Sequence, residues 1–372
     1  MSKLRPIALY LPQFHPIPEN DEWWEKGFTE WNNVVKAKPQ FRNHYQPQLP
    51  ADLGFYDLRL KEARLAQEKM AKSHGIHGFC YYHYWFNGKR LLEEPLNRKL
   101  KNKEEDLPFM LCWANENWTR AWDGGDTKIL LKQNYSYEDD IHHICSLLPY
   151  FKDERYIKVN GKPVFIIYKD SSFPDITKTI NTFREESAKH GLELYLCRFD
   201  RAIGTLPDSA TDLGFDAAFE FQPLSKALII YKNKYLKANR IINFTTRALK
   251  IPFSFNVRID YKTFIDLDLN LHNQEYKCFP GVSPGWDNSS RRPVGKATIF
   301  EGSTPDKFKY WLSKKLQNFE PYSHEENFIM INAWNEWAEG NHLEPCKKWG
   351  LQFLEALNDE IFNYNKQKPS SI

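Results

Sequence analysis

The stretch NFIMINAWNEW, residues 327–337, combines the two features that predict the fold. Its first half is an apolar run with the length of a buried strand, and its second half changes to polar and aromatic residues. Seven other runs in the chain follow the same plan. The eight runs are PIALYLPQFH (6–15), IHGFCYYHYWF (76–86), LPFMLCWANENW (107–118), KPVFIIYKD (162–170), LELYLCRFD (192–200), GFDAAFEFQP (214–223), CFPGVSPGWDN (278–288) and NFIMINAWNEW (327–337).

Amphipathic stretches with helical periodicity separate these runs, for example 58–74, 176–190 and 305–319. Strands that alternate with helices pair in parallel, and eight such units predict a closed (β/α)8 barrel of the α/β class. The alternative is an open doubly wound sheet, which normally has a glycine-rich turn after its first strand. Here that turn is PQFHPIPEN, without glycine. We therefore predict one barrel domain over residues 1–365, followed by a frayed tail at 366–372.

Two segments interrupt the alternation. Residues 16–56 are rich in Trp, Pro and Asn, and a loop of this length is usually functional, so we expect it to face the substrate. Residues 224–270 form a basic and aromatic insertion with no acidic residue before Asp260. One interpretation is a solvated helical pair that covers one end of the barrel. The other is that residues 224–262 meet a membrane surface or a lipid-linked glycan through their positive charge.

The composition narrows the class of function. The 51 basic and 48 acidic residues leave a net charge of +3, too weak a field to indicate nucleic-acid binding. The six cysteines form no CxxC or Cys/His cluster, which argues against a disulfide framework or a zinc site. No cleavable leader or membrane-spanning run is recognisable. We expect a cytoplasmic protein, or one that rests on a membrane surface.

Motifs for other chemistries are missing from the chain. It has no GxSxG, HExxH, GxxxxGK[ST] or GxGxxG string, so the sequence predicts neither a metal nor an organic cofactor. Aromatic residues make up 15% of the chain and include 12 Trp, a composition that suits a cleft in which rings stack on sugars.

Candidate site residues follow from the rule that active sites of such barrels form where the strands end. The polar and aromatic residues at these ends, together with two from the long loop, are Glu30, Trp31, His83, Trp85, Asn115, Glu116, Trp118, Arg120, Glu220, Trp286, Asp287, Asn288, Arg291, Trp334, Asn335, Glu336, Trp337 and Glu339.

The strongest local signal is INAWNEWAEGNHLEP, residues 331–345. Glu336 and Glu339 lie three residues apart, and a helical turn places such Cβ atoms ~5–6 Å from one another. Two close carboxyls push their pKa values apart, so that one holds a proton while the other is ionised, which suits cleavage of a glycosidic bond with retention. Alternatively, one or both glutamates are exposed salt-bridge partners, or Glu116 is the partner of Glu336 across the barrel mouth.

The other candidates carry open alternatives. Asp287 and Asn288 suit hydrogen bonds to vicinal hydroxyls, and Arg291 suits a phosphate or carboxylate on the substrate. A tight loop in which Asp287 pairs with an arginine explains the same residues. His83 stands in an aromatic run, where a histidine is more often part of the core.

The motifs together are similar to those of the WbsX family, a glycoside hydrolase family 99-like group often labelled glycosyltransferase in surface-polysaccharide gene clusters. The strings that carry the resemblance are ALYLPQFHPIPEN, GFTEWNNV, GFCYYHYWFNGKRLLE, PFMLCWANENWTRAWDG, GKPVFIIYK, FEFQP, PGWDNSSRR and INAWNEWAEGNHLEP. They run from about Pro6 to Leu357. The resemblance implies a (β/α)8 barrel and a role in bacterial O-antigen, capsule or related glycan metabolism.

The family 99 endo-α-mannosidases and mannanases resemble this chain more distantly, at EWAE. The resemblance implies that Glu336 deprotonates the 2-hydroxyl of the sugar to form a 1,2-anhydro sugar. Glu339 would protonate the leaving oxygen and then activate water. Ala338 stands where those enzymes are expected to have histidine, so mannose specificity does not carry over.

Three functions follow from the sequence. The first is a retaining glycoside hydrolase-like enzyme that acts on an α-linked bacterial surface glycan. The second is a glycosyltransferase that passes the sugar to an acceptor hydroxyl with the same carboxylates. The third is a glycan-binding protein without catalysis.

Overall fold

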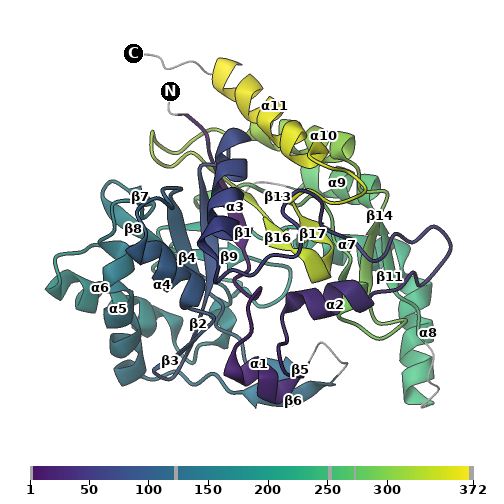
Figure 1. Cartoon of the computed structure of the whole chain (residues 1–372), viewed down its shortest axis with the longest axis horizontal. Coiled ribbons are helices and arrows are strands. Elements are labelled where there is room, and N and C mark those ends of the chain that lie inside the picture. Colours follow the sequence, from purple (N-terminus) through teal and green to yellow (C-terminus); the bar gives the residue numbers. More distant parts are fainter. Residues whose placement is uncertain (1–2, 121–124, 250–253, 272–273, 368–372) are drawn as a thin grey trace.

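The computed structural model describes residues 3–120, 125–249, 254–271 and 274–367, and its centre is a ring of parallel strands surrounded by helices (Figure 1). Each of the eight predicted runs contains part of this ring, so the barrel prediction is confirmed. The strands are β1 (Arg5–Tyr10), β2 (Gly78–Phe86), β4 (Phe109–Trp113), β8 (Lys162–Ile167), β9 (Tyr195–Asp200), β10 (Ala217–Glu220), β12 (Cys278–Phe279), β13 (Gly281–Val282) and β15 (Phe328–Ile331).

The ring closes through the interrupted strand that contains β12 and β13. β12 pairs in parallel with β10, and β13 pairs in parallel with β15, so residues 278–282 join the two ends of the sheet. Pro280 separates the two halves, and its carbonyl oxygen accepts a hydrogen bond of 2.9 Å from the Met330 amide. A Cβ on Gly281 would lie 2.4 Å from the carbonyl oxygen of Glu220, so this crossing requires glycine.

Helices cover the outside of the ring (Figure 1). The stretches 58–74, 176–190 and 305–319 form α3 (Lys61–Ser73), α6 (Ile176–Lys189) and α10 (Pro305–Asn318), as predicted. Asp175 and Thr304 cap α6 and α10 by accepting hydrogen bonds from backbone amides of the first turn. The other long helices are α4 (Glu94–Lys101), α5 (Tyr137–Phe151), α7 (Lys226–Tyr235), α8 (Lys237–Ala248), α9 (Tyr261–Leu269) and α11 (Gln352–Gln367).

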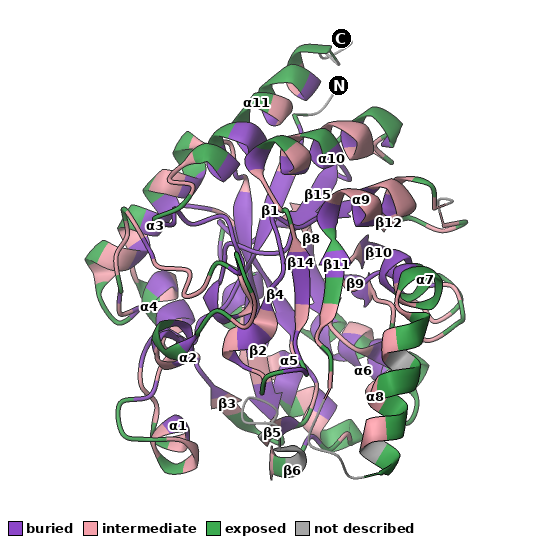
Figure 2. Ribbon diagram, turned by 90° about the vertical axis from the view of Figure 1, so that its right-hand side faces the viewer, coloured by how far each residue is buried: buried purple, intermediate pink, exposed green. Residues whose placement is uncertain are grey.

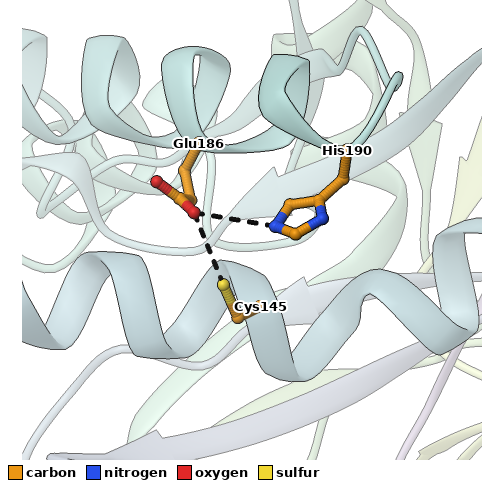
Figure 3. A group of neighbouring side chains, drawn as sticks. All are labelled: Cys145, Glu186 and His190. Carbon is orange, nitrogen blue, oxygen red and sulfur yellow. Dashed lines mark hydrogen bonds and ion pairs between the residues drawn. The ribbon is translucent and has the colours of Figure 1, made fainter.

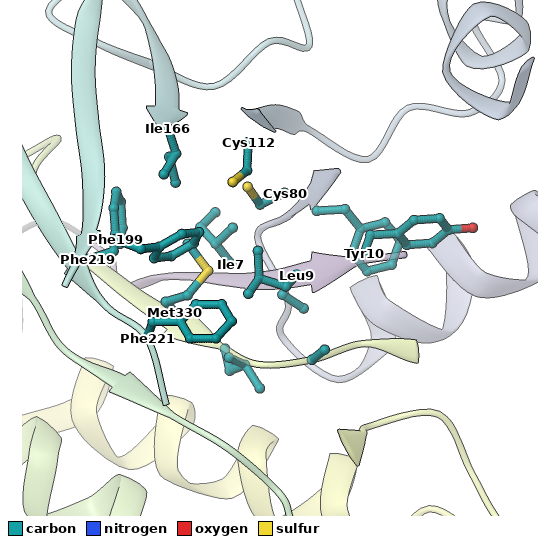
Figure 4. Close-up of a cluster of buried hydrophobic side chains, with 14 of the residues drawn as sticks. Ile7, Leu9, Tyr10, Cys80, Cys112, Ile166, Phe199, Phe219, Phe221 and Met330 are labelled. Carbon is teal, nitrogen blue, oxygen red and sulfur yellow. The ribbon is translucent and has the colours of Figure 1, made fainter. Parts of the chain in front are cut away.

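The interior of the barrel is filled by apolar side chains, and the strands are buried along their length (Figures 2 and 4). Leu9, Cys80, Cys112, Phe219 and Met330 come from five different strands and are at most 1% exposed. The barrel is therefore a packed core and not a channel, and a substrate has access only at its rim.

Short elements surround the rim at the carboxyl ends of the strands, which we call the barrel mouth. The segment 16–56 carries α1 (Pro18–Trp23) and α2 (Glu30–Lys36). The chain after β4 forms a hairpin of β5 (Trp118–Arg120) and β6 (Gly125–Leu131). Other short strands are β3 (Lys89–Leu91), β11 (Val257–Asp260), β14 (Thr298–Glu301), β16 (Asn335–Glu336) and β17 (Asn341–His342). Strand β7 (Lys158–Val159) pairs antiparallel with the first residues of β8 and therefore lies at the opposite, amino end of the barrel.

A buried ion pair fixes α3 to the segment before β4. The Arg64 guanidinium donates two hydrogen bonds of 2.9 and 2.7 Å to Glu105, and both side chains are at most 5% exposed. We predict that Glu105→Gln lowers the free energy of unfolding by about 3–5 kcal/mol, because it leaves a buried guanidinium without its counter-charge. Urea denaturation measures this loss.

The control is Glu94→Gln, which breaks a pair with Arg98 in which both side chains are at least 40% exposed. It should cost less than about 1 kcal/mol. Equal losses for the two variants would show that the buried pair does not stabilise this corner of the barrel.

Candidate active site

The chain after β15 makes a compact turn that carries both predicted glutamates. β16 pairs antiparallel with β17, and the one-turn 3-10 helix η4 (Trp337–Glu339) lies between them. Gly340 ends the turn with a φ of 55°, in the left-handed region that favours glycine. Asn335 fixes the turn to the barrel, because its side chain accepts a hydrogen bond from the Leu11 amide and donates one to the Leu11 carbonyl.

Arg291 brings the two glutamates together with a third. One terminal nitrogen of its guanidinium lies 2.9 Å from Glu339 and the other lies 3.2 Å from Glu336. The second of these nitrogens also lies 2.6 Å from Glu30, and the Nε atom donates to the same Glu30 oxygen at 2.7 Å. Both carboxyls of the predicted pair therefore lie within the span of one guanidinium. They are salt-bridge partners, as the alternative interpretation expected, but their side chains are only 8% and 21% exposed.

The group is buried, although one member retains access to solvent. The side chains of Glu30, Arg291 and Glu336 are at most 9% exposed, and that of Glu339 is 21% exposed. Burial raises the pKa of Glu336 to about 8, against an ordinary value of 4.5, although Arg291 opposes the shift. Burial also raises the pKa of Glu339 and that of Glu30, again opposed first by Arg291.

Burial disfavours the charged carboxyls, and the single positive charge of Arg291 contacts all three of them, so the group retains a proton at neutral pH. Because Glu336 and Glu339 interact strongly, this proton belongs to the pair and not to one residue. A pair that holds one proton and one charge contains a general acid and a general base side by side, which is the arrangement that cleavage of a glycosidic bond needs.

Aromatic and basic groups at the strand ends lie near this pair. Burial, and then the charge of Glu336, raise the pKa of Tyr84, whereas the positive charge of Arg201 lowers the pKa of Glu339. Arg201 stacks on the ring of Tyr168 at 3.9 Å, and its Nη1 atom lies 3.9 Å from Glu116. Sequence analysis missed Tyr84, Tyr168 and Arg201, although all three stand at or just after the ends of predicted strands.

A cavity of about 470 Å³ lies beside the carboxyl group, outside the ring. Its lining includes Phe41, Trp286, Asp287, Gly340 and Trp349 but neither catalytic candidate. The cavity and the pair are neighbours, because the Asp287 amide donates a hydrogen bond of 2.6 Å to the Glu339 carbonyl. The pair is the stronger candidate for chemistry than the cavity, since the pair combines close carboxyls with a raised pKa.

The model of the family described as "Glycosyltransferase WbsX" matches residues 6–357. This chain belongs to the WbsX family. Two proteins of Xanthomonas campestris pv. campestris, each called "Uncharacterized protein WxcX", are 39% identical to it over 362 residues. The match covers 95% of this chain and 49% of each relative, so the chain spans about half the length of these curated relatives.

Solved structures confirm the fold of this WbsX family member. A glycoside hydrolase-like protein superposes with a TM-score of 0.58 at 14% identity, covering 97% of this chain and 94% of the other. The GH99 endo-alpha-mannosidase from Bacteroides thetaiotaomicron superposes with a TM-score of 0.59 at 12% identity, and both chains are covered completely. At these identities the likeness establishes the barrel architecture alone.

Trp334 and Trp337, two of the candidate site residues, pack beneath the turn in this WbsX family member. Trp334 is fully buried and its ring lies 5.0 Å from that of Phe79. Trp337 is 2% exposed, stacks on His342 and donates a hydrogen bond of 2.6 Å to Glu344. Both rings pack between the turn and the barrel core, because large apolar side chains next to a closed core are stabilised by burial.

Glu344 is a buried acid that the sequence analysis did not consider. Besides Trp337, it accepts hydrogen bonds from Tyr56 at 2.8 Å and from Gln67 at 2.7 Å. Burial raises its pKa to about 7, although these donors favour the ionised form. Glu344 therefore holds Trp337 in place, two residues before Glu339.

His83 and Trp85 also belong to the core. His83 is 3% exposed, and its Nε2 atom lies 2.9 Å from that of His143 on α5. Trp85 is 4% exposed, stacks on the same histidine and donates to Asp139. The structure packs both side chains in the core, as the alternative interpretation of His83 expected, and their contact with a substrate stays a prediction.

Asp287 was expected to bind sugar hydroxyls or to pair with an arginine, and the structure gives it other partners. His44 and Gln46, both from the long loop, each place a side-chain nitrogen 2.7 Å from its carboxylate, and Arg291 has turned to the glutamates instead. Asn288 accepts a hydrogen bond from the Thr298 amide. Asp287 therefore fixes the long loop beside the cavity, and its oxygens are occupied by protein donors.

The remaining candidates divide between the mouth and the barrel wall. Glu30 joins the carboxyl group, Trp31 stands next to it with its ring 5.6 Å from Trp337, and Glu116 lies at the mouth. Asn115, Trp118, Glu220 and Asn335 have protein partners or are packed in apolar clusters. Strand β5 includes Arg120, but its side chain lies outside what the structure describes.

A group with metal-binding donor atoms lies in the outer helical layer, away from the pair. Cys145 on α5 and Glu186 and His190 on or after α6 point toward one another (Figure 3). Lys189 already holds Glu186 at 2.6 Å, so an ion would have to displace a positive charge. We assign no metal to this group.

The pH dependence of folding tests the raised pKa of Glu336. The folded chain keeps the proton up to about pH 8, whereas the unfolded chain releases it near the ordinary value of 4.5. Between these values the unfolded state binds fewer protons, so this residue lowers stability as the pH rises. We predict that Glu336→Gln becomes progressively more stable than the wild type between pH 5 and pH 8 in thermal denaturation.

Glu104→Gln is the control, because its side chain is 67% exposed. Its difference from the wild type should stay constant over the same range. If the Glu336→Gln difference also stays constant, the carboxyl is ionised throughout and the shared proton does not exist.

Proposed function

We propose that this chain is a retaining, glycoside hydrolase-like enzyme that acts on an α-linked bacterial surface glycan. One observation carries the proposal: two neighbouring carboxyls with raised pKa values share one buried arginine at the mouth of a (β/α)8 barrel. Membership of the WbsX family and the fold shared with glycoside hydrolases support glycan chemistry. The aromatic cavity next to the pair suits further sugar residues of a polymer.

The mechanism that fits the pair proceeds in two steps. The reactive form is the one in which the single proton of the pair lies on Glu339 and Glu336 is ionised. In this form Glu336 accepts the proton of the sugar 2-hydroxyl while this oxygen attacks the anomeric carbon, and Glu339 gives its proton to the leaving oxygen. The products are a 1,2-anhydro sugar and a free hydroxyl on the departing chain. Glu339 then takes a proton from the water that attacks the anomeric carbon, and Glu336 returns its proton to the 2-oxygen. The net reaction is hydrolysis with retention.

Arg291 has a defined part in this cycle. It keeps one carboxyl charged in a buried setting and holds the two at a fixed spacing, while Glu30 occupies its remaining face. The Glu339 side chain is partly exposed, which suits a general acid and base that must contact both the leaving group and water. The proton passes between the two glutamates through the substrate, so neither needs bulk solvent as a partner.

The test uses the surface polysaccharide of the producing bacterium as substrate, with release of oligosaccharides followed by mass spectrometry. We predict release without a sugar donor, and a loss of about 10²–10⁴-fold in Glu336→Gln and in Glu339→Gln. Glu116→Gln is the matched control, a mouth carboxyl 41% exposed that should keep most activity. Full activity in Glu339→Gln with loss in Glu116→Gln would overturn the assignment.

Substrates with a fluoride leaving group separate the two roles. Fluoride leaves an α-glycosyl fluoride without being protonated, so Glu339→Gln should regain much of the rate of the first step with this substrate. Glu336→Gln should not regain activity, and a fluoride methylated at the 2-oxygen should be inert with every form of the protein. Turnover of the methylated compound would exclude the 1,2-anhydro intermediate.

A glycosyltransferase is the second candidate, because the matching family carries that description and Arg201 and Arg291 place positive charge at the mouth. The same carboxyls then deliver the sugar to an acceptor hydroxyl instead of water. Product that forms only when a nucleotide sugar or a lipid-linked donor is added favours transfer. Neither release nor transfer, with glycan binding unchanged in Glu336→Gln, favours a binding protein.

A further inference from the structure

The basic insertion forms a projecting arm, which we define as residues 226–249 with α7 and α8. Between Phe221 and Ile259 the chain has no Asp or Glu but eight Lys or Arg residues, although the whole protein is nearly neutral at +3. The eight are Lys226, Lys232, Lys234, Lys237, Arg240, Arg247, Lys250 and Arg258. Such a local excess is an electrostatic feature of this surface and not of the protein as a whole.

Exposed apolar side chains gather on the same segment. Of the nineteen large apolar side chains that are exposed among the described residues, eight lie between residues 229 and 255. These eight are Ile229, Ile230, Tyr235, Ile241, Ile242, Phe244, Leu249 and Phe255. Phe244 is 75% exposed and Leu249 is 65% exposed, so burial within this chain contributes little to stability at these side chains.

The polarity of α8 is the reverse of that of an ordinary surface helix. Asn243 faces the protein, where its side chain donates to the Phe255 carbonyl at 3.0 Å and accepts from the Phe255 amide at 2.8 Å. Ile241 and Phe244, which follow each other at helical spacing, are 59% and 75% exposed. A surface helix normally packs its apolar face against its own protein. The apolar face of α8 is instead exposed, where a partner outside the chain can contact it.

We propose that the arm docks this protein on an anionic lipid bilayer, with Ile241, Phe244 and Leu249 entering the headgroup boundary and the lysines beside the anionic headgroups. Basic residues around an exposed apolar face are what an interfacial helix needs. A second copy of the chain fits poorly, because two surfaces without acidic residues repel each other. No helix in the part of the chain that the structure describes is long and apolar enough to cross a bilayer.

The arm lies at the end of the molecule where the mouth opens. α7 begins just after the carboxyl end of β10, and α8 reaches the same end as α1 and the β5–β6 hairpin in both views (Figures 1 and 2). A bilayer that touches α8 therefore lies on the side of the molecule to which the mouth opens. If the proposed function holds, a glycan still attached to its lipid carrier is the substrate that such a position favours.

Vesicle binding tests the docking without reference to activity. Purified protein is floated with vesicles of phosphatidylcholine alone and with vesicles that contain about 30% phosphatidylglycerol. We predict binding to the anionic vesicles only, weakened as the salt concentration rises from about 50 to about 500 mM. Binding to neither vesicle, or equal binding to both, would overturn the proposal.

Two variants probe the apolar and basic halves of the arm. Ile241→Glu with Phe244→Glu should weaken binding roughly tenfold or more, because two inserted side chains become anionic. Lys226→Gln, Lys234→Gln and Lys237→Gln together should weaken it roughly 100-fold. All five side chains are exposed, so circular dichroism and the melting temperature should not change.

Controls carry the same kinds of change elsewhere, with one apolar side chain and three lysines replaced. Phe362→Glu replaces an aromatic side chain that is 65% exposed on α11, at the opposite end from α8 (Figure 2). Lys69→Gln, Lys101→Gln and Lys366→Gln together remove three exposed charges from α3, α4 and α11. If the controls weaken binding as much as the arm variants, the contact is nonspecific. If the arm variants instead change the oligomeric state without changing vesicle binding, the face belongs to a second copy.

Since vesicle binding needs no catalysis, its failure and the failure of the proposed function are distinguishable. Activity on released polysaccharide with no vesicle binding would overturn only the docking. Vesicle binding with no glycan chemistry would overturn only the enzyme.

Discussion

The arrangement of the site depends on one guanidinium. Arg291 contacts Glu30 from the long loop after β1 and two glutamates from the turn after β15, so three distant segments meet at one side chain. Removing a charge from water is costly unless its partners compensate, and here three acidic partners surround one base. Burial, and after it the excess of carboxyls, retains a proton in the group. The same contact that folds the mouth therefore prepares an acid and a base.

The barrel supplies the rigidity that this group requires. The turn that carries Glu336 and Glu339 is tied to β1 through Asn335 and supported from behind by Trp334 and Trp337, which are both buried. Glu344 in turn holds Trp337. The conspicuous aromatic residues of this motif therefore position the glutamates, and the open cavity lies elsewhere, beside Asp287.

The parts of the fold that local pattern determines were predictable. The eight apolar runs became the barrel strands because each is buried on both faces, and 58–74, 176–190 and 305–319 became helices because their apolar periodicity covers the ring. The spacing of Glu336 and Glu339 predicted a close pair for the same reason, since both lie on one turn.

Contacts between distant segments could not be read from the sequence. Glu30 and Arg291 are 261 residues apart, and nothing in either motif names the other. The partners of Asp287, His44 and Gln46, come from a loop whose path no periodicity predicts. Trp334 was a candidate site residue because the sequence does not tell whether a ring at the end of a strand points into the core or toward the mouth. Arg201 was missed because it follows the last residue of its strand by one position.

The central claim is that the carboxyl group keeps a proton at neutral pH, and carbon NMR on protein labelled at the glutamate carboxyl carbon measures this directly. We predict a carboxyl signal that titrates near pH 8 in the wild type and is missing in Glu336→Gln. If every glutamate signal completes its titration below about pH 6, near the ordinary range for glutamate, the shared proton does not exist and the account fails.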